Sequence, residues 1–242
     1  YKDGFWITRM GYKSRIDEFA KRHKSAEAMG GPHKIEARRA KGLLSARERI
    51  DQLLDKGTFK EIGKFATSLR PEDLENTPAD GKISGFGRID GRKVAVISND
   101  LTVKGASSND INSKKISHLK RSAIDSGMPL VFLAESSGGR VPDSIGAVAM
   151  GLGGQDPEQY IRRRKVPWVT AALGPCYGSS SWYATLSDFV VMRKGAEIAV
   201  SSAKVASVAI GQEVDPEELG GWRLHTTTTG LVDVAVDTAE EA

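Results

Sequence analysis

The feature that most constrains the fold is a buried-strand pattern that occurs twice, each time followed by a turn of small residues. An apolar run at 130–134 leads into Glu-Ser-Ser-Gly-Gly-Arg at 135–140, and a second at 166–173 leads into Gly-Pro-Cys-Tyr-Gly-Ser at 174–179. Apolar runs of this length, flanked by helical patterns, are typical of strands in a sheet that is covered on both faces. The sequence therefore predicts an α/β fold.

The segments around these strands predict the rest of the fold. Alternating apolar residues on either side of Asp90-Gly91 predict a β-hairpin that starts near residue 82, because this dipeptide supplies the positive φ angles of a tight turn. Ser45 and Glu48 form a capping-box pattern that predicts the start of a helix. Further helices are expected at 13–29, 109–126, 157–165 and 203–210, and further strands at 189–192, 196–201 and 231–236.

The N-terminal part differs in pattern from the rest of the chain. The helix at 13–29 carries an apolar stripe that includes Ile16 and Phe19. Residues 69–80 contain two prolines and show no periodicity, so we expect a surface loop there. We therefore expect an N-terminal helical segment and loop at 1–80, followed by one α/β domain at 81–242.

Composition excludes several classes of protein. The 35 Lys and Arg residues exceed the 31 Asp and Glu residues by only four, and no RNP-like or finger pattern accompanies them, so we expect no nucleic-acid partner. A mild basic bias suits a small anionic ligand. The single cysteine, Cys176, excludes an intrachain disulfide and a multi-thiolate metal centre, and it favours a reducing compartment.

No stretch reaches the roughly 18 consecutive apolar residues of a membrane span, and residues 1–13 lack the apolar core of a signal peptide. We therefore expect a cytoplasmic protein with no membrane partner and no metal. The first residue is Tyr rather than Met, which is consistent with a fragment of a longer chain.

The two glycine-bearing turns define the candidate site. A strand that ends in such a turn and feeds a helix presents backbone N–H groups where the helix dipole also favours negative charge. Two turns at one sheet edge can aim these donors at an oxygen that becomes negative in a transition state. The candidate donors are Gly138, Gly139, Gly178 and Ser179. Tight turns with a purely structural role remain the alternative at this point.

A set of motifs in one order over residues 40–242 is more specific than either turn. The set comprises SARERID at 45–51 with Leu53, Leu54 and Asp55; Asn99-Asp100 with Thr102, Val103 and Gly105; 135–140; 174–176 with Gly178; 187–190; 211–221; His225-Thr226; Gly230; and 240–242. Together these motifs resemble the carboxyltransferase (beta) subunits of biotin-dependent acyl-CoA carboxylases of the propionyl-, acetyl- and 3-methylcrotonyl-CoA type. The resemblance implies a crotonase-like β-β-α spiral fold with two homologous halves, of which this chain resembles the N-terminal one.

The resemblance also implies a reaction and its participants. Carboxybiotin on a partner carrier domain releases CO₂, its biotin nitrogen removes the α-proton of a coenzyme A thioester, and the enolate attacks CO₂. The implied partners are an acyl-CoA, a biotin carboxyl carrier or biotin carboxylase subunit, and a C-terminal carboxyltransferase half, within a homo-oligomer. In a eukaryote the implied location is the mitochondrial matrix. The protein needs no side-chain base, but it needs donors for the enolate oxygen.

Five residues are expected to contact coenzyme A on the basis of this resemblance. They are Arg38, Arg39, Lys41, Arg140 and Tyr177. A second basic run at 162–165 is a further candidate, although a solvated helix end remains the alternative for both basic runs. The chain departs from the family pattern in three places: Ser137 replaces a glycine, Tyr177 replaces a small residue, and Ser179 replaces a glycine. A narrower acyl pocket is implied.

Rival enzymatic functions lack the side chains that they require. A hydratase needs two carboxylates around its substrate, and only Glu135 and Asp143 lie near a turn; we expect Glu135 to accept hydrogen bonds at a strand end. The serines at 179–181 are not in a Gly-x-Ser-x-Gly pattern, and His118 and His225 are expected to be structural. Cys176 is expected to pack as a small apolar residue. A decarboxylase component and a non-catalytic assembly half remain open.

Overall fold

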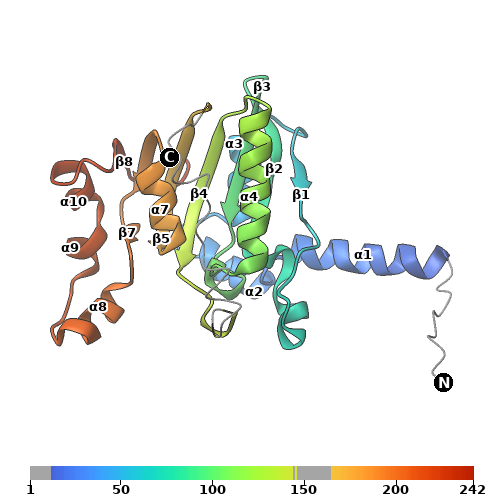
Figure 1. The fold of residues 1–242 in the computed structure, drawn as a ribbon, viewed down its shortest axis with the longest axis horizontal. Coiled ribbons are helices and arrows are strands. Elements are labelled where there is room, and N and C mark those ends of the chain that lie inside the picture. Colours follow the sequence, from blue (N-terminus) through green and yellow to red (C-terminus); the bar gives the residue numbers. More distant parts are fainter. Residues whose placement is uncertain (1–11, 144, 146–164) are drawn as a thin grey trace.

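The computed structural model describes residues 12–143, 145 and 165–242, and a mixed β-sheet lies at its centre (Figure 1). Its strands in chain order are β1 (Lys60–Ile62), β2 (Lys82–Ile89), β3 (Arg92–Asn99), β4 (Leu130–Ser137), β5 (Trp168–Tyr177), β6 (Phe189–Arg193), β7 (Glu197–Ala199) and β8 (Val234–Val236). The spatial order is β1-β2-β3-β4-β5-β6-β8, and β7 pairs with β5. The first three strands are antiparallel, and the pairs from β3 onward are parallel.

Local sequence signals explain the hairpin and the starts of two helices. Asp90 and Gly91 have φ angles of 49° and 76°, and they join β2 to β3 as a tight turn, as predicted. Ser45 and Glu48 cap α3 reciprocally, and Asn109 caps α4 in the same way. The helices are α1 (Tyr12–Ala28), α2 (Pro32–Arg39), α3 (Ala46–Leu53), α4 (Asp110–Asp125), α7 (Ser179–Leu186), α8 (Ala203–Ile210), α9 (Pro216–Gly220) and α10 (Trp222–Thr227). The helix expected at 157–165 lies outside the described residues, except for Lys165.

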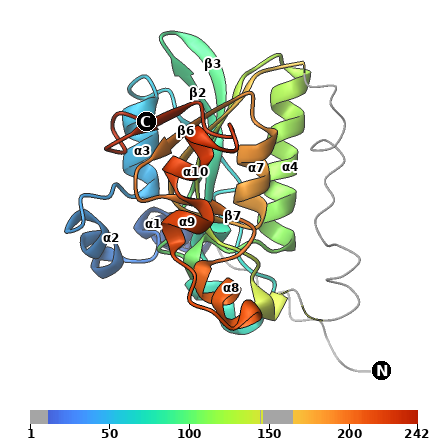
Figure 2. The same ribbon diagram turned by 90° about the vertical axis from the view of Figure 1, so that its left-hand side faces the viewer.

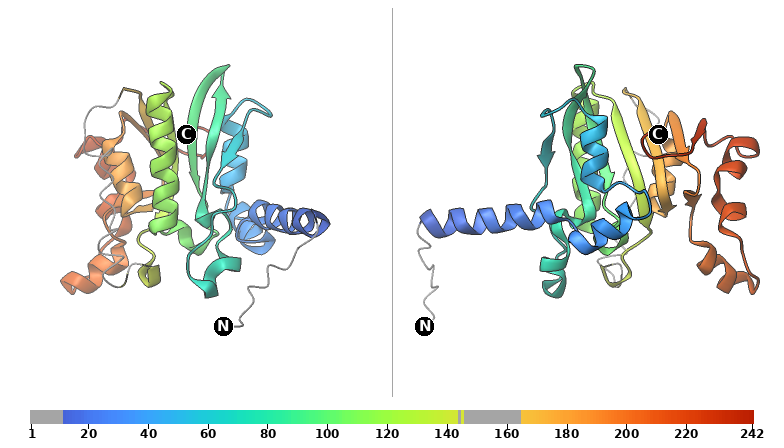
Figure 3. Two further views of the ribbon diagram at one scale, coloured as in Figure 1. Left: turned by 45° about the vertical axis from the view of Figure 1, so that its right-hand side comes forward. Right: turned by 180° about the vertical axis from the view of Figure 1, so that it is seen from behind.

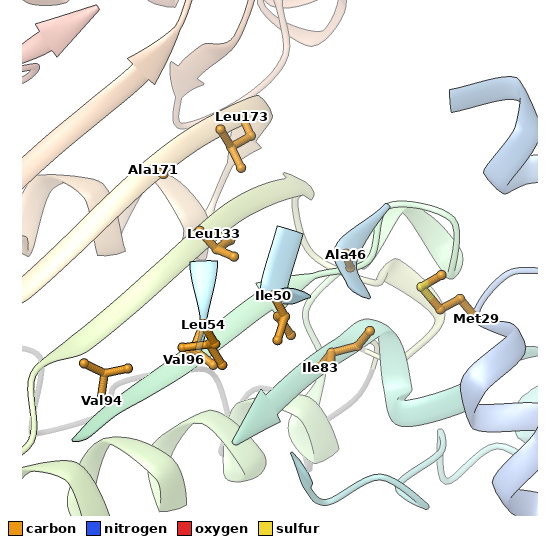
Figure 4. Close-up of a cluster of buried hydrophobic side chains, with 10 residues drawn as sticks. All are labelled: Met29, Ala46, Ile50, Leu54, Ile83, Val94, Val96, Leu133, Ala171 and Leu173. Carbon is orange, nitrogen blue, oxygen red and sulfur yellow. The ribbon is translucent and has the colours of Figure 1, made fainter. Parts of the chain in front are cut away.

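Helices cover both faces of the sheet, which confirms the predicted α/β architecture. α4 and α7 lie on one face and α3 lies on the other (Figure 2). The side chains of Ile50 and Leu54 pack between α3 and the strands, against Val96 and Leu133 (Figure 4). On the opposite face, Leu119 of α4 belongs to a second cluster of buried apolar residues.

The two apolar strands extend further than their sequence predicts. β4 continues through Ser137 and β5 through Tyr177, so half of the first predicted turn and two thirds of the second are strand. The extension arises because Ser136 pairs with Cys176, and Ser137 with Tyr177, beyond a register shift after Ala134. The turns themselves begin at Gly138 and Gly178.

The segment at 69–80 is only in part the surface loop that its composition predicts, since 69–76 lie largely at the surface. It contains two 3₁₀ helices, η1 (Pro71–Asn76) and η2 (Pro78–Gly81), and residues 77–80 are buried. Asp80 is drawn into the interior by an ion pair with Arg140, whose nitrogen lies 2.6 Å from the carboxylate. The division of the chain at residue 80 stays a prediction.

The predicted N-terminal helix exists as α1, but its apolar stripe is largely exposed. Ile16 and Phe19 are 49% and 57% exposed. The helix projects from the body of the molecule (Figure 3), and its stripe meets the ring of Phe65, which contacts Phe19 edge-on, and Lys64, which contacts His23. Among the described residues, no helix is both long and apolar enough to cross a membrane.

Candidate functional site

The two glycine turns lie next to each other at the C-terminal ends of β4 and β5. A Cβ atom added to Gly178 would stand 3.5 Å from the Cα of Gly138, which is ordinary van der Waals contact. Both glycines have positive φ angles, 102° at Gly138 and 60° at Gly178, which other residues rarely adopt. The meeting of the turns, predicted from the two strand patterns, is therefore confirmed.

The structure reduces the four candidate N–H donors to two. The N–H of Gly138 donates to Ser136 Oγ at 3.1 Å, and that of Gly178 donates to Val200 O at 3.2 Å. Within the described residues, the N–H groups of Gly139 and Ser179 have no hydrogen-bond acceptor. Gly139 is exposed and has open space where a Cβ would stand. Ser179 is the first residue of α7, where helical N–H groups lack partners within the helix.

Ser108 contacts both turns, and it is a residue that sequence reasoning missed. Its N–H donates to Gly138 O, and its carbonyl accepts from the N–H of Arg140, both at 2.8 Å. Its hydroxyl shares a hydrogen bond of 2.6 Å with the hydroxyl of Ser179. No motif in the sequence singles out Ser108, because its role depends on a contact between residues that are 71 positions apart.

Arg140 supports the first turn from the interior. Its guanidinium is buried, lies 2.6 Å from Asp80, and donates to both the hydroxyl and the carbonyl of Ser107. Arg140 is only 5% exposed, and its contact with coenzyme A stays a prediction that this burial does not favour.

Arg38 is also turned inward, and its contact with coenzyme A likewise stays a prediction. Its guanidinium donates to both carboxylate oxygens of Glu135 at 2.9 Å and to the carbonyl of Leu44, and Arg49 lies 2.9 Å from Glu135 on another side. Glu135 is 1% exposed, so its predicted role as a structural acceptor at a strand end is confirmed. Arg39 and Lys41, by contrast, are exposed, and Arg39 pairs with Glu48 at the surface at 2.6 Å.

Tyr177 lies at the end of β5, half-buried beside the second turn. Its hydroxyl donates to Glu197 of β7 at 2.5 Å. Burial and the hydrogen bond to the Glu197 carboxylate raise the pKa of Tyr177 above its usual value, so the phenol stays neutral. The side chain is thus fixed at the edge of the candidate site.

Cys176, His225 and Ser181 are the side chains that a nucleophilic mechanism could use, and each is held by other contacts. Cys176 is buried, and burial raises the pKa of its thiol to about 12, which confirms its packing role. His225 contacts Ile198 O at 2.8 Å through Nε2, and Thr229 Oγ1 at 3.0 Å through Nδ1, so its structural role is confirmed too. Ser181 donates to Gly178 O. In the described part of the chain, no histidine hydrogen-bonds to a serine at 179–181, and no group of side chains could hold a metal ion.

Comparison with known proteins gives one consistent family. Residues 37–242 match the carboxyl transferase domain. The carboxyltransferase subunit of propionyl-CoA carboxylase from Haloferax mediterranei is 36% identical over 96% of this chain and 46% of its own length. The methylmalonyl-CoA carboxyltransferase 12S subunit of Propionibacterium freudenreichii is 31% identical over 95% of this chain and 44% of its own. The chain spans about half the length of the curated relatives it matches.

Solved structures agree with these relatives. A crystal structure of transcarboxylase 12S, with methylmalonyl-coenzyme A and methylmalonic acid bound, superposes with a TM-score of 0.82 at 29% identity, covering 95% of this chain and 46% of that one. The beta subunit of geranyl-CoA carboxylase from P. aeruginosa superposes with a TM-score of 0.72 at 25% identity, over 95% and 41%. The fold is therefore the crotonase-like α/β fold that the sequence resemblance implies.

Proposed function

The chain belongs to the carboxyl transferase domain family, and from this premise we propose that it forms the acyl-CoA-binding part of a biotin-dependent acyl-CoA carboxyltransferase. One observation carries the proposal. Two N–H groups that have no acceptor among the described residues, from Gly139 and Ser179, stand on adjoining turns at the ends of two paired strands. Donors placed in this way suit an oxygen that gains negative charge.

The proposed role of the chain is to hold the thioester carbonyl while its α-carbon loses a proton. The negative charge that develops on the oxygen is stabilised by the two N–H groups, each contributing about 3 to 4 kcal/mol to the barrier reduction. α7 adds its dipole, because Ser179 opens that helix. Carboxybiotin, brought by a partner's carrier domain, supplies the CO₂ unit and the base. The buried ion pairs of Arg38 and Arg140 are consistent with a site whose own side chains do not exchange protons.

The coenzyme A contacts follow from exposure. We assign the phosphates to Arg39 and Lys41, which project from the end of α2 and the turn after it. Arg38 holds α2 in place through Glu135, three residues before Gly138. Tyr177 is proposed to form one wall of the acyl pocket and to favour short acyl groups.

The proposed partners are a C-terminal carboxyltransferase half, a biotin carboxyl carrier and further copies of this chain. The relatives support them, because they are named as subunits, and the transcarboxylase 12S structure is described as a hexamer assembly. We propose a cytoplasmic location, or the mitochondrial matrix in a eukaryote; a relative from Mus musculus is named mitochondrial. Decarboxylation is the second candidate, since the methylmalonyl-CoA decarboxylase alpha subunit of Propionigenium modestum is 32% identical over 89% of this chain and 42% of its own length.

The first test measures binding. Isothermal calorimetry of the chain with acetyl-CoA, propionyl-CoA and a longer branched acyl-CoA, with free coenzyme A as the control, is expected to show binding that depends on the acyl group. Binding of none of the four ligands would favour a non-catalytic assembly half and contradict the proposal.

The second test removes one donor in the assembled enzyme. Gly139→Pro deletes the N–H of residue 139, and Gly139→Ala keeps it at a position where a Cβ meets nothing within 4 Å. We expect the proline variant to lose about 10²- to 10³-fold in kcat, and the alanine variant to stay near the wild type. Thermal melting checks that both variants fold. Equal kcat values for the two variants would overturn the donor assignment. Running the assay from both the acyl-CoA and the carboxylated acyl-CoA separates carboxylation from decarboxylation.

A further inference from the structure

We propose that the paired hydroxyls of Ser108 and Ser179 are positioning groups that fix the distance between the two N–H donors at Gly139 and Ser179. The inference rests on the proposed function, because it names the residues that hold the donor pair in register.

Ser108 moves with the first turn. Its backbone forms a parallel bridge to Gly139, made by the bonds from Ser108 N–H to Gly138 O and from Arg140 N–H to Ser108 O. Both bonds measure 2.8 Å. These contacts enclose the Gly139 peptide, so a displacement of Ser108 displaces the first donor.

Ser179 carries the second donor and the other hydroxyl. Its Oγ lies 2.6 Å from Ser108 Oγ, which is at the short end of the range for hydrogen bonds between hydroxyls. Both side chains are partly buried, which limits competition from water. The hydroxyl pair therefore joins the two turns beyond the last strand pair, Ser137 with Tyr177.

The turns need such a link because each contains a glycine, whose backbone can adopt many conformations. Gly138 and Gly178 lack side chains and adopt positive φ angles, and among the described residues no hydrogen bond joins one glycine to the other. Asn99 joins β4 to α7 deeper in the fold, by donating to Glu135 O and Ser180 Oγ. That contact reaches β4 at Glu135, three residues before Gly138, whereas the serine pair joins the turns themselves. A misplacement of about 1 Å at a reacting site can cost about 10²-fold in rate.

The test is a double-mutant cycle in the assembled, biotin-supplied enzyme. Ser108→Ala and Ser179→Ala each remove one hydroxyl and keep every backbone N–H. We expect each single variant to lose about tenfold in kcat, with KM for the acyl-CoA changed less than about twofold, and the double variant to lose no more than either single one. Ser108→Thr, which restores a hydroxyl, is expected to recover most of kcat. Ser122→Ala removes a hydroxyl from the surface of α4, where it bonds His118 O, and serves as the control.

A second readout does not depend on activity. Hydrogen–deuterium exchange of peptides covering 176–182 is expected to speed up in Ser108→Ala and to stay unchanged in Ser122→Ala. Unchanged exchange, multiplicative losses in the double variant, or a lower melting temperature with unchanged kcat would each overturn the positioning role. If the wild-type assembly carboxylates no acyl-CoA, the proposed function fails, and the exchange measurement still decides whether the serine pair links the turns.

Discussion

The two buried arginines near the turns form ion pairs inside the protein and stabilise the fold there. Arg38 and Arg140 were both expected to face coenzyme A, and both are buried against carboxylates. Sequence reasoning could not separate them from Arg39 and Lys41, because adjacent basic residues look alike until the fold decides which side chain turns inward. In the fold, Arg38 is distinguished by its pairing with Glu135, which lies 97 positions away in the sequence.

Lys82 allows a test of how burial changes the pKa of one side chain and, through it, the stability of the fold. Its ammonium group donates to Ala106 O at 2.6 Å beneath the first turn, and burial lowers its pKa to about 7. Between about pH 7 and its ordinary pKa, the unfolded chain holds this proton and the folded chain does not. Stability contributed by this group therefore rises with pH in that window, by up to about 1.4 kcal/mol per pH unit.

We expect Lys82→Met to be more stable than the wild type near pH 7 and to lose this rise. Ala106 O keeps a second donor, Ser136 Oγ at 3.2 Å, so the variant leaves no buried carbonyl without a partner. Urea unfolding between pH 6 and 10 measures the two curves, and Lys93→Met at an exposed position is the control. Parallel curves for the wild type and Lys82→Met would show that Lys82 is not desolvated in the folded protein.

Elements with a strong local signal were predicted well, and those defined by tertiary contact were not. The hairpin at Asp90-Gly91 and the capping box at Ser45 need only neighbouring residues. β1 has three residues and exists through its pairing with β2, and α2 begins at Pro32 after Gly31, which supplies no side-chain cap. The exposed stripe of α1 shows the converse, since amphipathic spacing predicts a helix but not the surface that covers it.

The capping box stabilises the start of α3, the helix that packs Ile50 into the core. Ser45 is buried; its hydroxyl accepts from Glu48 N–H, and its own N–H donates to Glu48 Oε2 at 2.7 Å. We expect Ser45→Ala to lower the free energy of unfolding by about 1 kcal/mol and Ser45→Asp, which keeps a capping oxygen, to lower it less. Denaturant unfolding of the three proteins measures both differences. Equal losses for the two variants would mean that packing around Ser45, rather than the cap, sets its contribution.

The whole molecule places the candidate site across two regions that are remote in sequence. Paired strand ends bring the glycine turns together, and the contact between Arg38 and Glu135 holds α2 close to the end of β4. Sequence patterns predicted the two turns, because each follows its own apolar strand. They did not reveal which N–H groups are free or that Ser108 links the turns, because both depend on contacts between distant segments.

The exposed basic residues at the end of α2 predict that part of the binding energy for an acyl-CoA depends on charge. Arg39 and Lys41 are exposed at the end of α2, where the phosphates of coenzyme A are proposed to lie. The Arg39→Gln, Lys41→Gln double variant is expected to raise the Kd for an acyl-CoA by roughly fivefold at low salt, because two solvent-exposed charge contacts are lost. The difference should shrink at about 1 M salt, where screening acts within about 3 Å.

Calorimetry at two salt concentrations measures this effect, with Lys114→Gln on α4 as the control, since Lys114 pairs with Asp110 on another face of the fold. The acyl preference should stay the same in the double variant, because the acyl group and the phosphates are held by different residues. A Kd that is unchanged at low salt would show that the phosphates of coenzyme A do not bind at the end of α2. A changed acyl preference would mean that α2 also shapes the acyl pocket, and the division between the turns and the basic residues would then fail.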